Sequence, residues 1–321
     1  MRFPPRFPVL TVVLTWFALS DATARAQSWR PPDESQRVPS KWGAGDQRGS
    51  ANHMKPESVL RAVKLIRTGE VVELGRVLGA AMPFFGTRRF DLHTKRTFHN
   101  AGANRRGSNE ELIVSEIGQV GTQLDGFAHQ TIGDTLYNGF KLDEIATRSG
   151  FQKLGVENVG SLITRGVLID LAGFKKVEML SDTYEITPQD LEQALGLQKL
   201  SVNPGDAILL HTGWGRLWGK DNTRYSKTCP GIGVAAAEWL ARKDPMLVGA
   251  DNFSVEVSPN PDPQVSLPVH QVMLVVNGIH LLENLNLEEL TAKRAYEFAF
   301  MVQPLKIQGG SGSTVAPIAI R

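Results

Sequence analysis

Side chains of metal-binding type gather in one glycine-rich stretch of the sequence. Gln119, Gln123, Asp125 and His129 follow one another at intervals of four, two and four residues. Alternate side chains of an extended strand share a face, so a strand would turn all four to one side, and a bend at Gly126 would bring His129 back over the others. The pattern is typical of a metal site. The alternative is a polar strand edge followed by a turn that holds one satisfied histidine.

A second pair of candidate ligands lies about 150 residues further along the chain. Pro268 opens an expected helix with His270 on its first turn, and Gly278 stops that helix. The strand expected next has Glu283 at its far end, so imidazole and carboxylate can meet in space. His280 belongs to the same strand, but as an alternate residue it should point elsewhere.

The glycine-rich stretch resembles the signature of a cyclase family that includes bacterial kynurenine formamidase and isatin hydrolase, His-x-Gly-Thr-His-x-Asp-x-Pro-x-His. Gly121, Thr122, Asp125 and His129 match this signature. Gln119 and Gln123 replace two histidines, and Phe127 stands where the family usually has proline. The resemblance continues through Trp42-Gly43, the turn Tyr137-Asn138-Gly139, the segment from Gly278-Ile279 to Glu283-Asn284-Leu285, and Gly312-Ser313.

The resemblance implies a ligand set for a divalent metal. In the family a late histidine and a glutamate complete the site, and His270 and Glu283 match them with one extra residue between. The candidate ligands are therefore Gln123, Asp125, His270 and Glu283, with Gln119 as a further candidate. Such a set suits Zn²⁺ or Mn²⁺, and amide oxygen in place of imidazole favours the harder ion and a single retained metal. The alternative is a site that lost its activity with its histidines.

His129 is the candidate proton carrier. A bound divalent ion activates water and polarises a carbonyl, and His129 outside the ligand shell would then exchange protons with the nucleophile and the leaving group. His129 could instead be a ligand, and both roles stay open on the sequence.

Four residues are candidates for the walls of a substrate pocket. Phe85 belongs to an irregular segment, residues 75–107, that is either a substrate loop or a surface excursion. Phe127 lies inside the signature stretch. His211 lies at the end of one expected strand and Asp251 follows another, at the ends where α/β sheets place their sites. His211 could instead be a core or loop histidine, and Glu256, shortly after Asp251, is expected only near the pocket.

Residues 1–26 have the form of a secretory signal peptide. Basic residues precede an apolar run that is too short to span a bilayer, and Ala24-Arg25-Ala26 gives a cleavage pattern. The leader carries Arg2, Arg6 and Arg25 against Asp21, so the 35 basic and 33 acidic residues of the chain become 32 of each. We therefore expect an exported, periplasmic or secreted protein, with no membrane attachment after cleavage and no nucleic-acid partner.

Residues 27–321 are expected to form one domain, with residues 27–41 as an extended arm on the surface or on a neighbouring subunit. Cys229 is the only cysteine, so no internal disulfide is possible. Strands and helices alternate, which indicates an α/β fold with a parallel sheet and antiparallel additions. The resemblance implies a β/β/α swivelling-type domain with a mixed, barrel-like sheet. Helices are expected at 56–68, from Pro188 after a Thr187 cap, at 234–241 and at 268–277, and strands at 70–74, 166–171, 206–212, 246–250, 279–283, 296–303 and 315–320.

Two functions from different classes follow. The first is a metal-dependent hydrolase of a small amide, lactam or lactone, for which the family suggests arylformamidase activity. The second is an exported, non-catalytic protein that binds a small molecule on the same scaffold. A homodimer or higher homo-oligomer is expected in either case. The glycine-rich segment 309–313 lacks the lysine and helix of a phosphate loop, and no serine stands in a nucleophile elbow.

Overall fold

The computed structural model describes Met1 and residues 28–100 and 102–321. The expected signal peptide lies outside this part, apart from Met1. Among the described helices, none is long and apolar enough to cross a bilayer.

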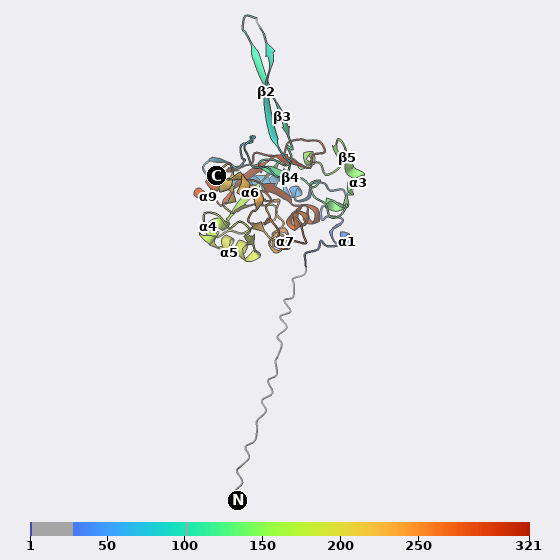
Figure 1. Ribbon diagram of the computed structural model, residues 1–321, viewed down its shortest axis with the longest axis vertical. Coiled ribbons are helices and arrows are strands. Elements are labelled where there is room, and N and C mark those ends of the chain that lie inside the picture. Colours follow the sequence, from blue (N-terminus) through green and yellow to red (C-terminus); the bar gives the residue numbers. More distant parts are fainter. Residues whose placement is uncertain (2–27, 101) are drawn as a thin grey trace.

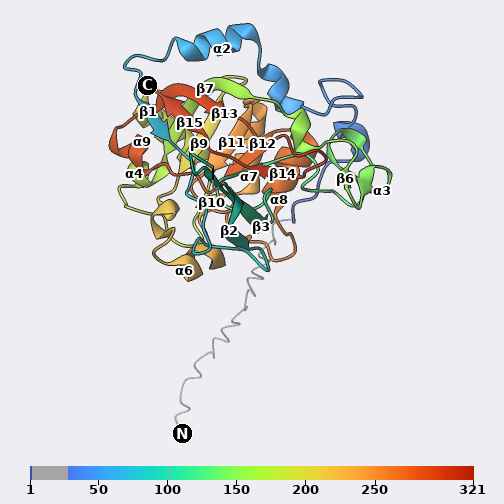
Figure 2. The same ribbon diagram turned by 90° about the horizontal axis from the view of Figure 1, so that it is seen from above.

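One curled, mixed sheet organises the molecule and confirms the α/β, barrel-like architecture (Figures 1 and 2). Its nine strands lie in the order β1 (Val71–Glu73), β15 (Ile318–Ile320), β13 (Glu297–Val302), β7 (Leu162–Asp170), β9 (Ala207–His211), β11 (Leu247–Ala250), β12 (His280–Glu283), β4 (Gln123–Asp125) and β14 (Gly312–Thr314). The four central strands β7, β9, β11 and β12 run parallel, and the outer pairings are antiparallel. The parallel strands therefore end at one edge of the sheet, where a site is expected.

Two apolar clusters fill the two faces of the sheet. Helices α4 (Leu171–Lys175), α5 (Pro188–Gln198) and α7 (Val234–Arg242) contribute to one, together with α8 (Pro268–His270) and the π-helix η5 (Gln271–Asn277). The other lies between the sheet and the segments before β1 and after β12, and helix α2 (Pro56–Val63) packs on that side against β7 and β13 (Figure 2). The predicted cap of α5 is confirmed, because Thr187 Oγ1 accepts from the amide of Asp190 at 3.2 Å and the Asp190 carboxylate accepts from the amide of Thr187 at 3.0 Å.

Helix α2 is shorter than the predicted helix 56–68. It ends at Val63. The amides of Thr68 and Gly69 instead donate to the carbonyl of Arg321 at 2.9 and 2.8 Å, which leads the chain into β1 beside the C-terminal strand β15. Pairing with a distant strand therefore replaces the last helical turn.

The segment expected to be irregular contains half of a long β-ribbon. β2 (Phe90–His99) pairs with β3 (Gly107–Ser115) in an antiparallel hairpin that projects from the body (Figure 1). Both strands are mostly exposed along their length. The prediction was wrong here because side chains on both faces of the ribbon meet solvent, so the apolar alternation of a half-buried strand is missing.

The N-terminal arm is only partly extended. A helical turn, α1 (Glu34–Arg37), interrupts it, and the arm lies against η2 (Tyr137–Gly139). The remaining short elements are η1 (Gly49–His53), α3 (Leu142–Ile145), β5 (Ala146–Thr147), β6 (Gly150–Phe151), η3 (Val156–Asn158), β8 (Glu185–Ile186), η4 (Trp214–Leu217), α6 (Asn222–Lys227), β10 (Gly231–Ile232) and α9 (Glu288–Ala292).

Candidate metal centre

The pairing of β4 with β12 brings the two halves of the predicted site together. Gln123 stands directly opposite Glu283, and Asp125 stands two residues along the same face of β4. Gln123 Nε2 donates to Glu283 Oε2 at 2.8 Å. Strand β4 is only three residues long, so Gln119 reaches the cluster from the preceding turn and His129 from the turn that begins at Gly126.

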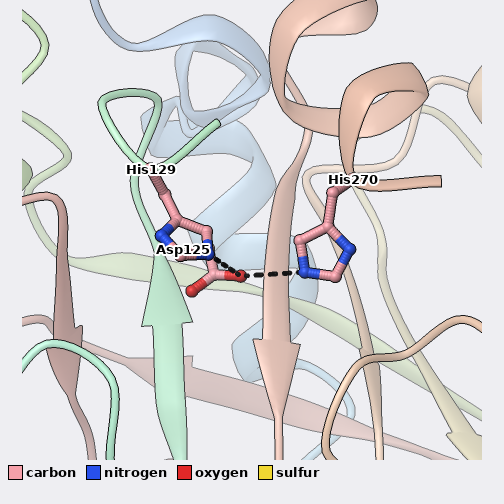
Figure 3. Close-up of side chains that lie close together, drawn as sticks. All are labelled: Asp125, His129 and His270. Carbon is pink, nitrogen blue, oxygen red and sulfur yellow. Dashed lines mark ion pairs between the residues drawn. The ribbon is translucent and has the colours of Figure 1, made fainter. Parts of the chain in front are cut away.

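Two imidazole nitrogens face the Asp125 carboxylate (Figure 3). Asp125 Oδ2 lies 3.6 Å from His270 Nε2 and 4.0 Å from His129 Nε2. His270 Nε2 also lies 3.2 Å from Glu283 Oε1. Asp125, His270 and Glu283 are all buried. Strand β4, helix α8 and strand β12 therefore aim one polar group each at a common point.

Glu256 fixes the orientation of His270. Its Oε1 lies 2.5 Å from His270 Nδ1 and accepts from the backbone amide of His270 at 3.1 Å, while Oε2 accepts from the amide of Val269 at 3.2 Å. Nδ1–H pointing at a carboxylate leaves Nε2 as the nitrogen that faces Asp125 and Glu283. A carboxylate behind a histidine in this way is the usual support for a metal ligand.

The loop that carries Glu256 is held in an uncommon conformation. Val255 has φ of 60°, which is rare for a β-branched residue. The side chain of Asn252 holds the turn, because its Oδ1 accepts from the amides of Ser254 at 3.2 Å and Val255 at 2.7 Å. Strained backbone of this kind tends to occur at functional sites, and here it directs Glu256 at His270.

The residues fit a divalent cation. Asp125 Oδ2 is buried and has no hydrogen-bond partner among the described residues. Asp125, His129 and His270 each offer a ligand atom, and these atoms lie within 4.8 Å of one another. Two ligands about 2.1 Å from a tetrahedral ion lie roughly 3.4 Å apart. The separations of 3.2 Å and 3.6 Å at His270 are close to this value, whereas the 4.0 Å to His129 is wider.

The electrostatics of the cluster show an excess of negative charge. Burial and the neighbouring charge of Asp125 raise the pKa of Glu283 to about 7. Burial opposes protonation of His270, but its contacts with Glu256 and Glu283 outweigh that effect and raise its pKa well above the ordinary value. A carboxylate that holds on to its proton and a histidine that gains one indicate that the cluster lacks positive charge. Metal binding at this point would release protons and weaken at low pH.

The two glutamines act as hydrogen-bond donors in the structure. Besides its contact with Glu283, Gln123 Nε2 donates to Gln119 Oε1 at 3.2 Å, and Gln119 Nε2 donates to Asp125 Oδ1 at 3.3 Å. Their N–H groups thus orient both carboxylates. The ligand role expected for Gln123 and Gln119 stays a prediction, since the amide N–H groups rather than the oxygens face the carboxylates.

His129 stands at the rim of the cluster. Its side chain is 17% exposed, in contrast to the enclosed Asp125. Burial lowers the pKa of His129 against the attraction of Asp125, so its neutral form prevails near pH 7. A neutral imidazole beside a buried ligand set is able to accept a proton from a group bound there.

A small hollow opens next to the cluster. Its lining includes Phe85, Arg88, Gln123 and Glu283, and its volume is about 10 Å³. That is room for about one water molecule, which is too little for an organic substrate. Phe85 packs on Phe253 with ring centroids 4.0 Å apart, and it is the predicted pocket residue that borders the hollow.

The other predicted pocket residues lie elsewhere. Phe127 is in the core, stacked on His280 with centroids 4.2 Å apart, because the turn after β4 directs it beneath the sheet. His280 points away from the cluster as expected, with Nδ1 3.0 Å from the Asp125 carbonyl oxygen. Asp251 is fully buried and accepts from the backbone amides of Thr212 and Gly213, both at 2.9 Å.

His211 joins two carboxylates at the ends of neighbouring parallel strands. Its Nδ1 lies 2.7 Å from Asp170 Oδ1, and its Nε2 lies 3.9 Å from Asp251 Oδ2. Burial opposes protonation of His211, but the hydrogen bond to Asp170 and the charge of Asp251 raise its pKa above the ordinary value. The geometry is that of a buried ion pair that ties β7 to β9 and β11.

Two residues of the site carry roles that the sequence analysis did not assign. Glu256 follows β11 and was only placed near a pocket, and Arg88 lay in the segment expected to be irregular. The position of Glu256 after a parallel strand was the available signal. Its contact with His270 depends on the turn at Val255, which no local pattern indicates.

The fold and the site define an α/β protein with a buried carboxylate–histidine site at the edge of its parallel strands. The chain matches a family model described as "Putative cyclase" over residues 72–257, which is more than half of its length. The chain belongs to this family.

Solved structures support the same assignment. The chain is 34% identical to a protein described as a novel cyclase, with a TM-score of 0.79, over 88% of this chain and 98% of that one. It shares its fold with isatin hydrolase A from Ralstonia solanacearum, at 23% identity and a TM-score of 0.57 over 78% and 92% of the two chains. A potential metal-dependent hydrolase with cyclase activity gives 17% identity and 0.51 over 78% and 98%. The comparison with curated proteins gives no match.

Replacing Glu256 tests whether it supports a metal ligand. Glu256→Gln removes the charge behind His270, and we expect the affinity for Zn²⁺ and Mn²⁺ to fall by about 10–100-fold. Isothermal titration calorimetry on metal-free protein measures this affinity, and circular dichroism confirms the fold. Glu238→Gln, on the exposed side of α7, is the matched control. Unchanged affinity in Glu256→Gln would show that Glu256 does not support a metal ligand.

The His211 ion pair predicts a pH dependence of stability. Its folded-state pKa is raised, so its stabilisation is complete below about pH 6.5, the unfolded value, and is lost as pH rises through the folded value. We expect His211→Gln to lower the free energy of unfolding by about 3 kcal/mol at pH 6, and by less at pH 9.

Urea unfolding of metal-free wild type and variant, with a chelator present, measures this difference. The exposed His99→Gln is the control. A difference between wild type and His211→Gln that grows with pH would contradict the charged form of His211.

Proposed function

We propose that the protein is a metal-dependent hydrolase of a small amide, lactam or lactone. The observation that carries the proposal is the buried Asp125 Oδ2, which has no hydrogen-bond partner in residues 28–100 and 102–321 and lies next to His270 Nε2, itself close to Glu283. The names of the structural relatives, isatin hydrolase and potential metal-dependent hydrolase, support the same reaction class. Arylformamidase activity is the specific reaction that we propose to test first.

Asp125, His270 and Glu283 would hold one divalent ion, Mn²⁺ or Zn²⁺. When bound, such an ion activates water and polarises a carbonyl group. Gln123 and Gln119 keep the two carboxylates in position through their N–H groups. Glu256 keeps the Nε2 atom of His270 turned toward them. These supports set the geometry in advance, which is what a site needs to act without reorganisation.

His129 would move the proton in this reaction. Its Nε2 lies next to the ligand atoms but at a wider spacing than theirs, and its side chain reaches the surface of the cluster. Neutral imidazole accepts the proton of the attacking water and returns it to the leaving nitrogen or oxygen. Arg88 borders the same hollow and carries a charge that attracts the developing oxyanion of a carbonyl substrate.

Paired variants test the proposal. Asp125→Ala should abolish both metal content and turnover in a folded protein, because it removes the central charge of the site. His129→Ala should keep the metal and lower kcat by about 10²–10⁴-fold. The substrates are N-formyl aromatic amines, isatin-like lactams and lactones, each assayed with added Mn²⁺ or Zn²⁺, and metal is measured by mass spectrometry.

The results separate the alternatives. Loss of metal in His129→Ala would make that residue a ligand. Normal turnover of His129→Ala with its metal retained would refute proton transfer by His129. A wild type that binds ligand but holds no metal and turns over none of these substrates would instead be the exported, non-catalytic binding protein.

We also propose that the exported chain is a homodimer or higher homo-oligomer. The β2–β3 ribbon supports this, since Leu92, Leu112 and Ile113 are 51%, 54% and 44% exposed on it. A lone two-stranded hairpin is marginally stable in water and gains stability by packing.

Leu92→Ser combined with Ile113→Ser should therefore convert the oligomer to monomer in analytical ultracentrifugation. Leu197→Ser, at a 71% exposed position outside the ribbon, should not. A wild type that is monomeric at all concentrations would contradict the proposal.

A further inference from the structure

A cavity of about 170 Å³ lies where the N-terminal arm crosses the ends of α7 and η5. Its lining includes Arg37, Lys41, Trp42, Tyr137, Asp244 and Asn277. The Tyr137 ring packs on Phe127, with centroids 4.5 Å apart, and Phe127 stacks on His280. That stack of rings separates the cavity from the candidate metal centre.

Arg37 is the unusual residue of this cavity. It is only 9% exposed, and its Nε and Nη1 atoms are buried with no hydrogen-bond partner in residues 28–100 and 102–321. A guanidinium carries five N–H donors and keeps its charge at all physiological pH values. Burying such a group without an acceptor is costly, so its position requires an acceptor that those residues do not supply.

A second donor in the cavity is also without an acceptor. Trp42 Nε1 is buried and unpartnered within the described part of the chain. The carboxylate that lines the cavity, Asp244, is already engaged by Lys41 and lies 2.9 Å from His53 Nε2. The wall of the cavity therefore carries a positive charge and N–H donors that lack an acceptor, while its Asp244 carboxylate is already paired.

The walls of the cavity are fixed by the turn at residues 137–139. Asn138 accepts from the amide of Ser40 at 2.7 Å and donates to the carbonyl oxygens of Gly43 and Asp46 at 2.8 and 3.0 Å. The Tyr137 hydroxyl donates to Asp46 Oδ2 at 2.8 Å. Arm and body are thus joined by side-chain contacts that do not involve Arg37, and the cavity is formed before a ligand enters.

We propose that this cavity binds a small oxyanion, either a carboxylate or a phosphate group, through Arg37 and Trp42. Both groups present several oxygen acceptors that match the guanidinium fork. The volume suits a small anion, because pockets for larger organic ligands measure about 300–1,000 Å³. The proposal is independent of the hydrolase function, since none of the metal-site residues lines the cavity.

Titration of the mature, chelator-treated protein tests the site without interference from a metal. Inorganic phosphate and acetate are added at constant ionic strength, with chloride as the reference anion, and binding is followed by calorimetry and by thermal unfolding. At one hundred times the Kd, we expect at least one oxyanion to raise the melting temperature by about 5 °C.

Variants locate the binding. Arg37→Met should abolish the heat of binding and the shift. Arg37→Lys, which keeps the charge without the fork, should weaken binding at least tenfold. Trp42→Phe should weaken binding by less. Arg148→Met removes the same charge from an exposed loop and should bind as wild type does.

Phosphate-only or acetate-only binding that depends on Arg37 supports the site and identifies the oxyanion. Equal stabilisation by chloride would overturn the proposal, and so would binding that survives in Arg37→Met. The absence of binding would also overturn it, at anion concentrations up to about 100 times that of the protein in calorimetry and about 0.1 M in thermal unfolding. If Arg37→Met does not fold, Arg37→Lys and Trp42→Phe give the same decision.

Discussion

The antiparallel pairing of β4 with β12 is the constraint on which the site depends. Its register sets Gln123 opposite Glu283 and turns Asp125 to the same face. A shift by one residue would place Leu124 in the polar cluster and turn Gln123 and Asp125 to the apolar face of the sheet. β14 holds the other side of β4 and so keeps a three-residue strand in place. The long-range sheet, rather than local propensity, therefore creates the site.

Much of this arrangement is predictable because the relevant signals are local. Alternation within β4 places Gln123 and Asp125 together, the proline before His270 sets it on a first helical turn, and Gly278 with φ of 60° ends that segment. The parallel strands are short apolar runs, which is how buried strands read in a sequence. The family signature adds the pairing of distant residues that periodicity does not supply.

The rest depends on contacts between segments that are far apart. Glu256 supports His270 across a turn whose unusual backbone at Val255 has no sequence signal. Phe127 belongs to the signature yet packs in the core, between the rings of Tyr137 and His280, which come from distant segments. The ribbon of β2 and β3 escapes prediction because solvent covers both of its faces. In the first two cases contacts between distant segments decide the position, and in the third the local pattern of a half-buried strand is missing.

Two histidine clusters lie along the same edge of the sheet, and charge distinguishes them. Around His211, the Asp251 carboxylate accepts from three backbone amides and from the Thr212 hydroxyl at 2.6 Å, while Asp170 pairs with the imidazole. Around His270, three carboxylates, those of Asp125, Glu256 and Glu283, meet one imidazole.

His270 already pairs with Glu256 at Nδ1, which leaves the carboxylates of Asp125 and Glu283 in excess at Nε2, and Asp125 Oδ2 receives no hydrogen bond from the described residues. Burying that excess without compensation would cost several kcal/mol per charge. A divalent cation would supply the missing charge at the point where Asp125, Glu283 and His270 Nε2 converge. The same chemistry that makes His211 a structural bridge therefore makes His270 a candidate ligand, and the difference lies in how many donors each carboxylate already has.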